Sequence, residues 1–114
     1  MSTERRKAGR IQTRLDARWE SILTRHNGTV VDVSVEGCFI LTSDDVQPSE
    51  LIRLEIEMPT KRRIYLWGEV VYQVHEMGFA LRFTGSDETE QKMLHMLIQY
   101  ARENQDDLRA GGLS

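Results

Sequence analysis

Apolar and polar residues alternate along most of residues 11–83. The first run places apolar or small side chains at every second position over residues 11–23, and a period of two is typical of a strand with one buried face. Residues 52–58 and 79–83 alternate in the same way, and residues 29–33 are dense in the β-branched side chains that strands favour. The pattern therefore predicts a chain built mainly of short antiparallel strands.

Glycine, proline and asparagine divide this pattern into separate strands. Residues 26–29 contain an Asn-Gly pair, which tolerates the positive φ angles of a tight turn, so we expect a hairpin turn there. The polar residues 43–50 are typical of a loop, and residues 59–61 of a turn into a long strand over 64–74. Gly68 lies inside that strand and predicts a bulge or a bend, the device with which a small barrel turns a corner.

A helix is predicted over residues 86–104. Asp87 can cap its first turn, and Glu90 stands three residues later in the capping-box position. Apolar residues then recur at helical spacing and form one stripe: Leu94, Leu97, Ile98 and Ala101. Residues 105–114 are mostly polar and include a Gly-Gly pair, so we expect them to fray.

This order of elements indicates an all-β fold, a six-stranded antiparallel β-barrel with a C-terminal helix packed against it. At 114 residues the chain suits one domain with a single core. We expect a flexible N-terminal arm over residues 1–10, the barrel over 11–84, the helix over 86–104 and a frayed tail over 105–114.

The composition is that of a folded protein, with 39% hydrophobic and 29% charged residues. No apolar run approaches the ~18 residues of a membrane span, and residues 1–10 lack the apolar stretch of a secretory signal. Cys38 is the single cysteine, so an internal disulfide is impossible. Together these features favour a cytoplasmic protein with no membrane insertion.

Charge is distributed unevenly along the chain. Residues 1–25 hold seven basic and three acidic side chains, a net +4, and the remaining residues hold eight basic and fifteen acidic, a net −7. A general nucleic-acid binder spreads positive charge over its body. A basic arm on an acidic body suits a small, compact anion better, so we expect no DNA or RNA partner.

Three arginines give the arm its chemistry. Arg6 and Arg10 are separated by three residues, and Arg5 stands directly before them. A planar guanidinium can form two hydrogen bonds at once to phosphate oxygens or to N7 and O6 of guanine, and it also stacks on bases. The spacing therefore fits a nucleotide ligand, although a solvated basic tail would share it.

A second motif, D-x-S-x-x-G, lies between the expected strands 29–33 and 38–41. Asp32 can accept hydrogen bonds from guanine N1–H and N2–H₂, Ser34 can donate or accept, and Gly37 lets the backbone approach a base. The alternative is a structural turn in which Asp32 and Ser34 bond local amides and Gly37 takes a positive φ.

In this order, the two motifs resemble those of the PilZ domain, a bacterial receptor for the second messenger cyclic di-GMP. The likeness covers roughly residues 4–100. Residues 68–72 and 78–83 resemble the family's later strands, including the glycine before the last one. Gly9 departs from the family pattern, which often has a proline or an apolar residue before the second arginine.

The resemblance implies a role for each motif residue. Arg6 and Arg10 would bind phosphate and guanine. The turn that carries Asp32, Ser34 and Gly37 would hold a guanine. The ligand implied is cyclic di-GMP, and no other cofactor is expected.

The same resemblance adds three further candidate ligand-binding residues. In the family, an arginine in the position of Arg5 accompanies a self-stacked pair of ligand molecules. Tyr72 stands where some members place an aromatic residue that stacks on guanine, although a strand tyrosine is also a common barrel-wall residue. Gly78 is the glycine that precedes the final strand.

These features predict a cyclic di-GMP receptor or adaptor that changes the conformation of its arm on binding and signals to a separate, unidentified protein. We expect neither catalysis nor a metal site, because no catalytic motif is present and the histidines and cysteine have no ligand spacing: His26, Cys38, His75 and His95. Two alternatives stay open. One is a PilZ-like protein–protein adaptor without nucleotide binding, and the other is a barrel that binds single-stranded nucleic acid.

Overall fold

The computed structural model describes residues 9–22, 24–85 and 87–104 of the chain. Its elements are the strands β1 (Ile11–Glu20), β2 (Arg25–Val33), β3 (Gly37–Leu41), β4 (Leu51–Glu57), β5 (Arg63–Val74) and β6 (Gly78–Phe83), and the helix α2 (Glu88–Glu103). Most of the predicted arm and the whole of the predicted tail lie outside the described residues.

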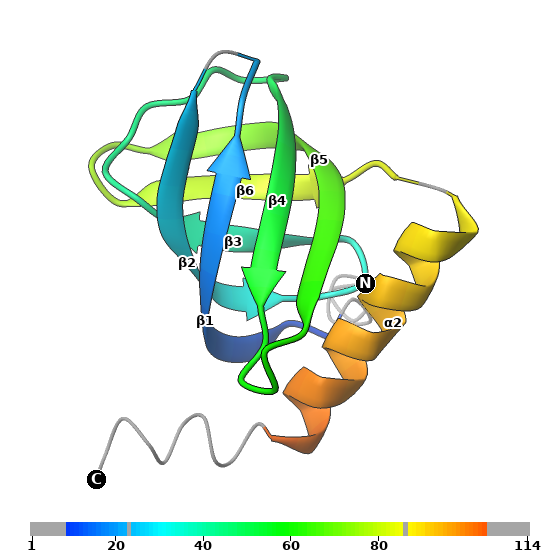
Figure 1. Cartoon of the computed structure of the whole chain (residues 1–114). Coiled ribbons are helices and arrows are strands. Elements are labelled where there is room, and N and C mark those ends of the chain that lie inside the picture. The colour runs from blue at the N-terminus through cyan, green and yellow to red at the C-terminus, as the bar shows by residue number, and fades with distance from the viewer. Residues whose placement is uncertain (1–8, 23, 86, 105–114) are drawn as a thin grey trace, which may run out of the picture.

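The strands form one closed antiparallel barrel, in the order β1-β2-β3-β6-β5-β4. The barrel closes where β1 pairs with β4, so β1 lies between β2 and β4 (Figure 1). Strands β3 and β6 pair with each other on the side away from that closure. The predicted fold class, a six-stranded barrel followed by one helix, is confirmed.

The barrel interior is filled by the apolar side of the alternating pattern. On β1 every second residue is buried from Ile11 to Trp19, and the residues between them are exposed. The indole of Trp19 meets the ring of Phe79 edge to face at a centroid distance of 5.1 Å, which joins β1 to β6 through the core. Burying such side chains is the main driving force for closing the barrel.

The predicted hairpin between β1 and β2 exists, but its turn was placed wrongly at residues 26–29. The turn is at Ser21–Thr24, where the Ser21 N–H donates to the Thr24 carbonyl oxygen at 3.0 Å. The Asn-Gly pair lies inside β2 instead, paired with β1. Gly28 is needed there for space, because a Cβ would approach the Ile40 side chain at 2.8 Å.

Gly68 lies where β5 changes neighbours, because it pairs with Ile52 of β4 and with Phe83 of β6. A corner at this glycine agrees with the predicted bend. The register irregularity falls between Val70 and Tyr72 rather than at Gly68, so of the two predicted alternatives Gly68 is the bend and the bulge comes after it. The bulge re-aims the side chains that follow it, and it shapes the groove described below.

The helix packs against β5 and β1 through its predicted apolar stripe, whose residues are all buried (Figure 1). Asp87 is its N-cap, and its carboxylate accepts from the Glu90 N–H at 2.8 Å. The Glu90 side chain does not complete the capping box. It accepts instead from the backbone N–H of Trp67 at 2.7 Å, which ties the first turn of α2 to β5.

Candidate ligand-binding groove

A groove of about 570 Å³ lies over the outer surface where the beginning of β3 meets β5 and β6. We call it the Arg10 groove. It is lined by Arg10, Val35, Glu36, Gly37, Val71, Tyr72, Ala80, Leu81, Arg82 and Phe83. Its charged lining residues are Arg10, Arg82 and Glu36, and each arginine has an acidic ion-pair partner beside the lining.

Arg10 and Asp32 bring the two sequence motifs together. The Arg10 Nη1 donates to Asp32 Oδ1 at 2.6 Å, with the two side chains 58% and 29% exposed. The barrel register explains this contact, because Ile11 pairs with Val33 and therefore places the preceding residue beside the end of β2. A guanidinium has five N–H donors, so Arg10 retains hydrogen-bonding capacity toward the groove.

Gly9 gives the chain its direction into this contact. Its φ is 60°, in the left-handed region. A proline, which is frequent at this position in the family that the motifs resemble, has its φ fixed near −65° and could not adopt this conformation. Glycine in place of proline therefore allows a left-handed backbone conformation directly before Arg10.

The turn between β2 and β3 is stabilised by its own serine. Ser34 is buried. Its N–H donates to the Gly37 carbonyl oxygen at 2.8 Å, and its Oγ accepts from the Glu36 N–H at 3.1 Å. Ser34 thus bonds local backbone amides, as expected if the motif is a structural turn. The turn also forms one edge of the groove.

Gly37 is required for close packing rather than for a positive φ. It pairs with Arg82 of β6, and a Cβ on Gly37 would collide with the carbonyl oxygen of Leu81. Gly9 is the one glycine with a positive φ among the described residues. The close approach of β3 and β6 leaves backbone, not side chain, at this point of the groove.

Cys38 lies beneath the contact between Arg10 and Asp32. Burial raises the pKa of its thiol, the nearby Asp32 carboxylate raises it further, and Arg10 opposes this by lowering it. This buried thiol is therefore protonated at neutral pH.

Tyr72 presents an aromatic surface to the groove. It follows the bulge in β5, its side chain is 51% exposed, and its ring centroid is 6.4 Å from that of Phe39. Gly78 does not line this groove. It pairs with Leu41 at the opposite end of β3, where a Cβ would collide with the Ile40 carbonyl oxygen. The structure therefore gathers Tyr72, but not Gly78, with the motif residues.

Arg82 is a groove residue that the sequence reasoning missed. It is the only charged residue of β6, and that isolated charge in an apolar strand was the available signal. Its position at the groove depends on which strands are neighbours in the closed barrel, which the local pattern does not reveal. The predicted ligand residues Arg5 and Arg6 lie outside the described residues.

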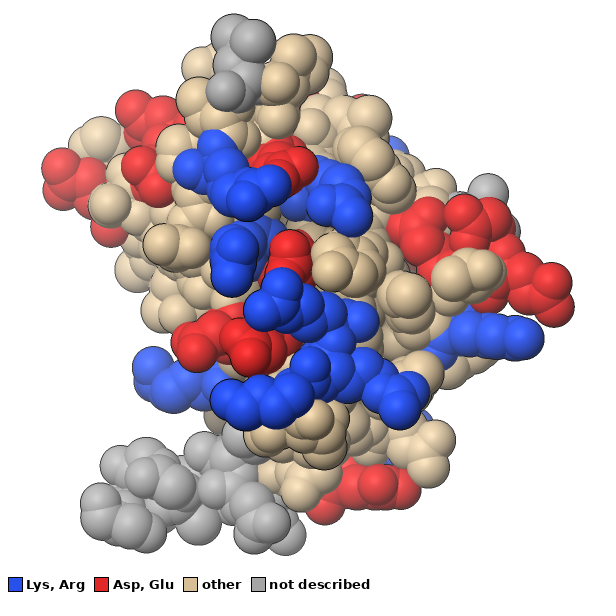
Figure 2. Space-filling model, in the orientation of Figure 1, with Lys and Arg blue, Asp and Glu red and all other residues tan. Residues whose placement is uncertain are grey.

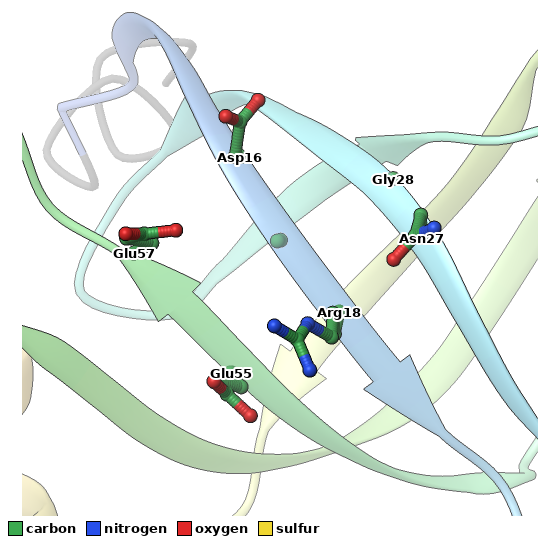
Figure 3. Close-up of a pocket in the computed structure, with 7 residues that line it drawn as sticks. Asp16, Arg18, Asn27, Gly28, Glu55 and Glu57 are labelled. Atoms are coloured by element: carbon green, nitrogen blue, oxygen red, sulfur yellow. The ribbon is translucent and has the colours of Figure 1, made fainter.

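A second, smaller pocket lies on the opposite side of the barrel, over β1, β2 and β4 (Figure 3). It has a volume of about 280 Å³, and Figure 3 shows three carboxylates around it, from Asp16, Glu55 and Glu57, with one guanidinium from Arg18. Basic and acidic side chains are mixed over this face (Figure 2). The pocket itself, with three carboxylates and one guanidinium, carries a net negative charge and suits a compact anion poorly.

The described residues bring no three potential metal ligands together. His26 instead stacks on Trp19, with ring centroids 4.3 Å apart, and its Nδ1 lies 3.0 Å from Asp44 Oδ2. Within the same described ranges, no helix has the length and apolar character needed to cross a membrane.

The sequence model of the PilZ domain matches residues 4–100. The PilZ domain of YcgR from Escherichia coli, solved with c-di-GMP, superposes with a TM-score of 0.74 at 15% identity, over 88% of this chain and 93% of that one. The PilZ domain of CeSA from a cellulose-synthesising bacterium gives a TM-score of 0.67 at 12% identity, over 77% and 92% of the two chains.

A third similar structure is the Bacillus subtilis inhibitor of motility, MotI/DgrA. It gives a TM-score of 0.67 at 21% identity, over 88% of this chain and 51% of that one. At these identities the likeness concerns the fold. Comparison with curated proteins gives no match.

Proposed function

This chain belongs to the PilZ domain family, and we propose that it is a receptor for cyclic di-GMP, which it binds in the Arg10 groove. The observation that carries the proposal is the contact between Arg10 and Asp32. Each residue comes from one of the two motifs, and they meet beside a groove lined by Arg10 and by Gly37 of the second motif.

The chemistry of the groove is complementary to this ligand. Arg10 can bind a phosphate or the N7 and O6 edge of a guanine, and the Asp32 carboxylate can accept from N1–H and N2–H₂ of a guanine. Tyr72 offers a ring on which a base can stack. A volume of about 570 Å³ is in the range of small-molecule sites rather than of a polymer track.

Arg5 and Arg6 belong to the same proposal through their place in the motif. We assign Arg6 the role of a second phosphate or guanine fork, and Arg5 that of a third fork that allows two stacked ligand molecules. Binding would draw the arm onto the groove, and a separate protein would recognise the changed arm. Hydrogen exchange of the amides of residues 4–12, with and without cyclic di-GMP, tests this change. Equal protection of these amides in both states would refute the proposed change of the arm.

The relatives supply a precedent for the proposal. The PilZ domain of YcgR was solved with c-di-GMP, and MotI is named as an inhibitor of motility. A PilZ domain thus serves as a receptor or adaptor rather than as an enzyme. The role proposed here is of the same kind.

One observation favours a second candidate, a protein–protein adaptor that binds no nucleotide. Asp32 is already engaged by Arg10, and the Ser34 hydroxyl oxygen is engaged by its own turn. Both acceptors of the second motif therefore have intramolecular partners. In an adaptor, the motif would serve only to stabilise the fold through these contacts.

Isothermal titration with cyclic di-GMP separates the two candidates. We expect saturable binding, and we expect Arg10→Ala to weaken it about ten- to hundredfold through loss of one bidentate contact worth ~1–3 kcal/mol. Arg10→Lys should restore little, because an ammonium cannot bridge two acceptors. Arg25→Ala is the control, since it removes one arginine outside the groove. No binding by the unmodified protein would favour the adaptor.

A further inference from the structure

Arg82 is held at the Arg10 groove by two backbone connections. Arg82 of β6 is the cross-strand partner of Gly37 in β3. The N–H of the next residue, Phe83, donates to the Glu36 carbonyl oxygen at 2.9 Å. Strand β6 is thereby fixed to the turn that follows β2. The guanidinium of Arg82 belongs to the groove wall because of this fixed strand, independently of the N-terminal arm.

In the structure Arg82 is restrained by an acidic neighbour. Its Nη2 forms an ion pair with Glu69 Oε1, and the two residues are cross-strand partners in β5 and β6. Their side chains are 59% and 35% exposed, so the guanidinium is accessible from the groove. An ion pair at this exposure is weak, and an incoming anion can compete for the guanidinium.

We propose that Arg82 is a ligand-contact residue of the Arg10 groove that binds an anionic oxygen of the nucleotide, and that Glu69 competes with the ligand for it. This inference rests on the proposed function. Arg10 and Arg82 are the two cationic residues of the groove wall. Arg10 reaches it from the residue before β1 and Arg82 from β6, so together they can hold an anion between them. Glu69 lowers the affinity for ligand, because its ion pair with Arg82 must be broken or rearranged on binding.

The barrel contains a closely matched control pair. Glu20 and Arg25 are also cross-strand partners, also form an ion pair, and are 30% and 63% exposed. Neither residue lines the Arg10 groove. Arg25→Ala and Glu20→Gln therefore reproduce the changes in net charge and in surface ion pairing without touching the proposed contact.

The test is titration of cyclic di-GMP into the unmodified protein and into Arg82→Ala, Arg82→Lys, Glu69→Gln and the double variant, with circular dichroism as the check of folding. We expect Arg82→Ala to bind about tenfold or more weakly, as for loss of a bidentate contact. Arg82→Lys keeps the charge and packs similarly, and we expect it to recover little of the affinity. Glu69→Gln should bind about two- to fivefold more tightly, in line with the strength of an exposed ion pair.

The double variant distinguishes competition from simple repulsion. If Glu69 competes for Arg82, Glu69→Gln gives no gain in the Arg82→Ala background, whereas general repulsion of the anion would give the same gain in both. Binding by Arg82→Ala within twofold of Arg25→Ala would overturn the contact. An equal gain in both backgrounds would overturn the competition. Failure of the unmodified protein to bind would instead refute the proposed function.

Discussion

The guanidinium of Arg10 lies 2.6 Å from the carboxylate of Asp32, so the last residue of the arginine motif is the partner of the first residue of the D-x-S-x-x-G motif. The two residues are 22 positions apart in the sequence, and the pairing of β1 with β2 brings them together. A ligand that uses both must share or replace this contact. In the free protein, the Arg10 guanidinium and the Asp32 carboxylate therefore satisfy part of each other's hydrogen-bonding capacity.

Asp32→Ala should weaken cyclic di-GMP binding about tenfold, because the guanine donors lose their charged acceptor. Its effect on folding should be small, about 0.2–1 kcal/mol, since the ion pair with Arg10 is partly exposed to solvent. Titration gives the affinity, and urea unfolding gives the free energy of unfolding. Asp16→Ala removes the same charge on the far pocket and is the control. Unchanged affinity with lowered stability would assign Asp32 a structural role alone.

The sequence predicted the strands well because their hydrophobic period is a local property that the barrel preserves. It misplaced the first turn because Asn27-Gly28 has a turn composition, whereas Gly28 is used for close packing against Ile40. The position of a residue across the barrel is not local. The pairing of Gly37 with Arg82 exists only once β3 and β6 are neighbours, so the motif residue was predicted and its partner was not.

Gly37→Ala should destabilise the domain by at least about 1–3 kcal/mol, the usual cost of forcing extra volume into a packed site. The added Cβ would collide with the Leu81 carbonyl oxygen, and β3 would have to separate from β6. Thermal unfolding followed by circular dichroism measures the loss. Val35→Ala changes an exposed residue of the same turn and should stay within about 0.5 kcal/mol of the unmodified protein. Equal melting temperatures for all three proteins would contradict the packing role.

Glu90→Ala should loosen the first turn of α2 from the barrel. It leaves the Trp67 N–H without its 2.7 Å acceptor, and a typical hydrogen bond contributes about 0.5–1.5 kcal/mol to stability. Glu90→Gln keeps an acceptor oxygen and should retain most of the stability. Glu88→Ala, a change at the other acidic residue of the first turn, controls for the helix dipole. Indistinguishable urea midpoints for Glu90→Ala and Glu88→Ala would show that the contact contributes nothing.

Arg5→Leu should change the number of bound ligands rather than abolish binding. If Arg5 supplies a third fork, two stacked cyclic di-GMP molecules bind each unmodified chain, because two ligands present more phosphate and guanine acceptors than Arg6 and Arg10 can satisfy. Without Arg5 the outer molecule loses its charged contact, and the ratio should fall toward one while the inner site persists. Titration at protein concentrations well above the dissociation constant reads this ratio directly. Lys7→Leu removes a neighbouring positive charge and should keep the ratio at two. A ratio of one in the unmodified protein would rule out the stacked pair and leave Arg5 as one more solvated charge.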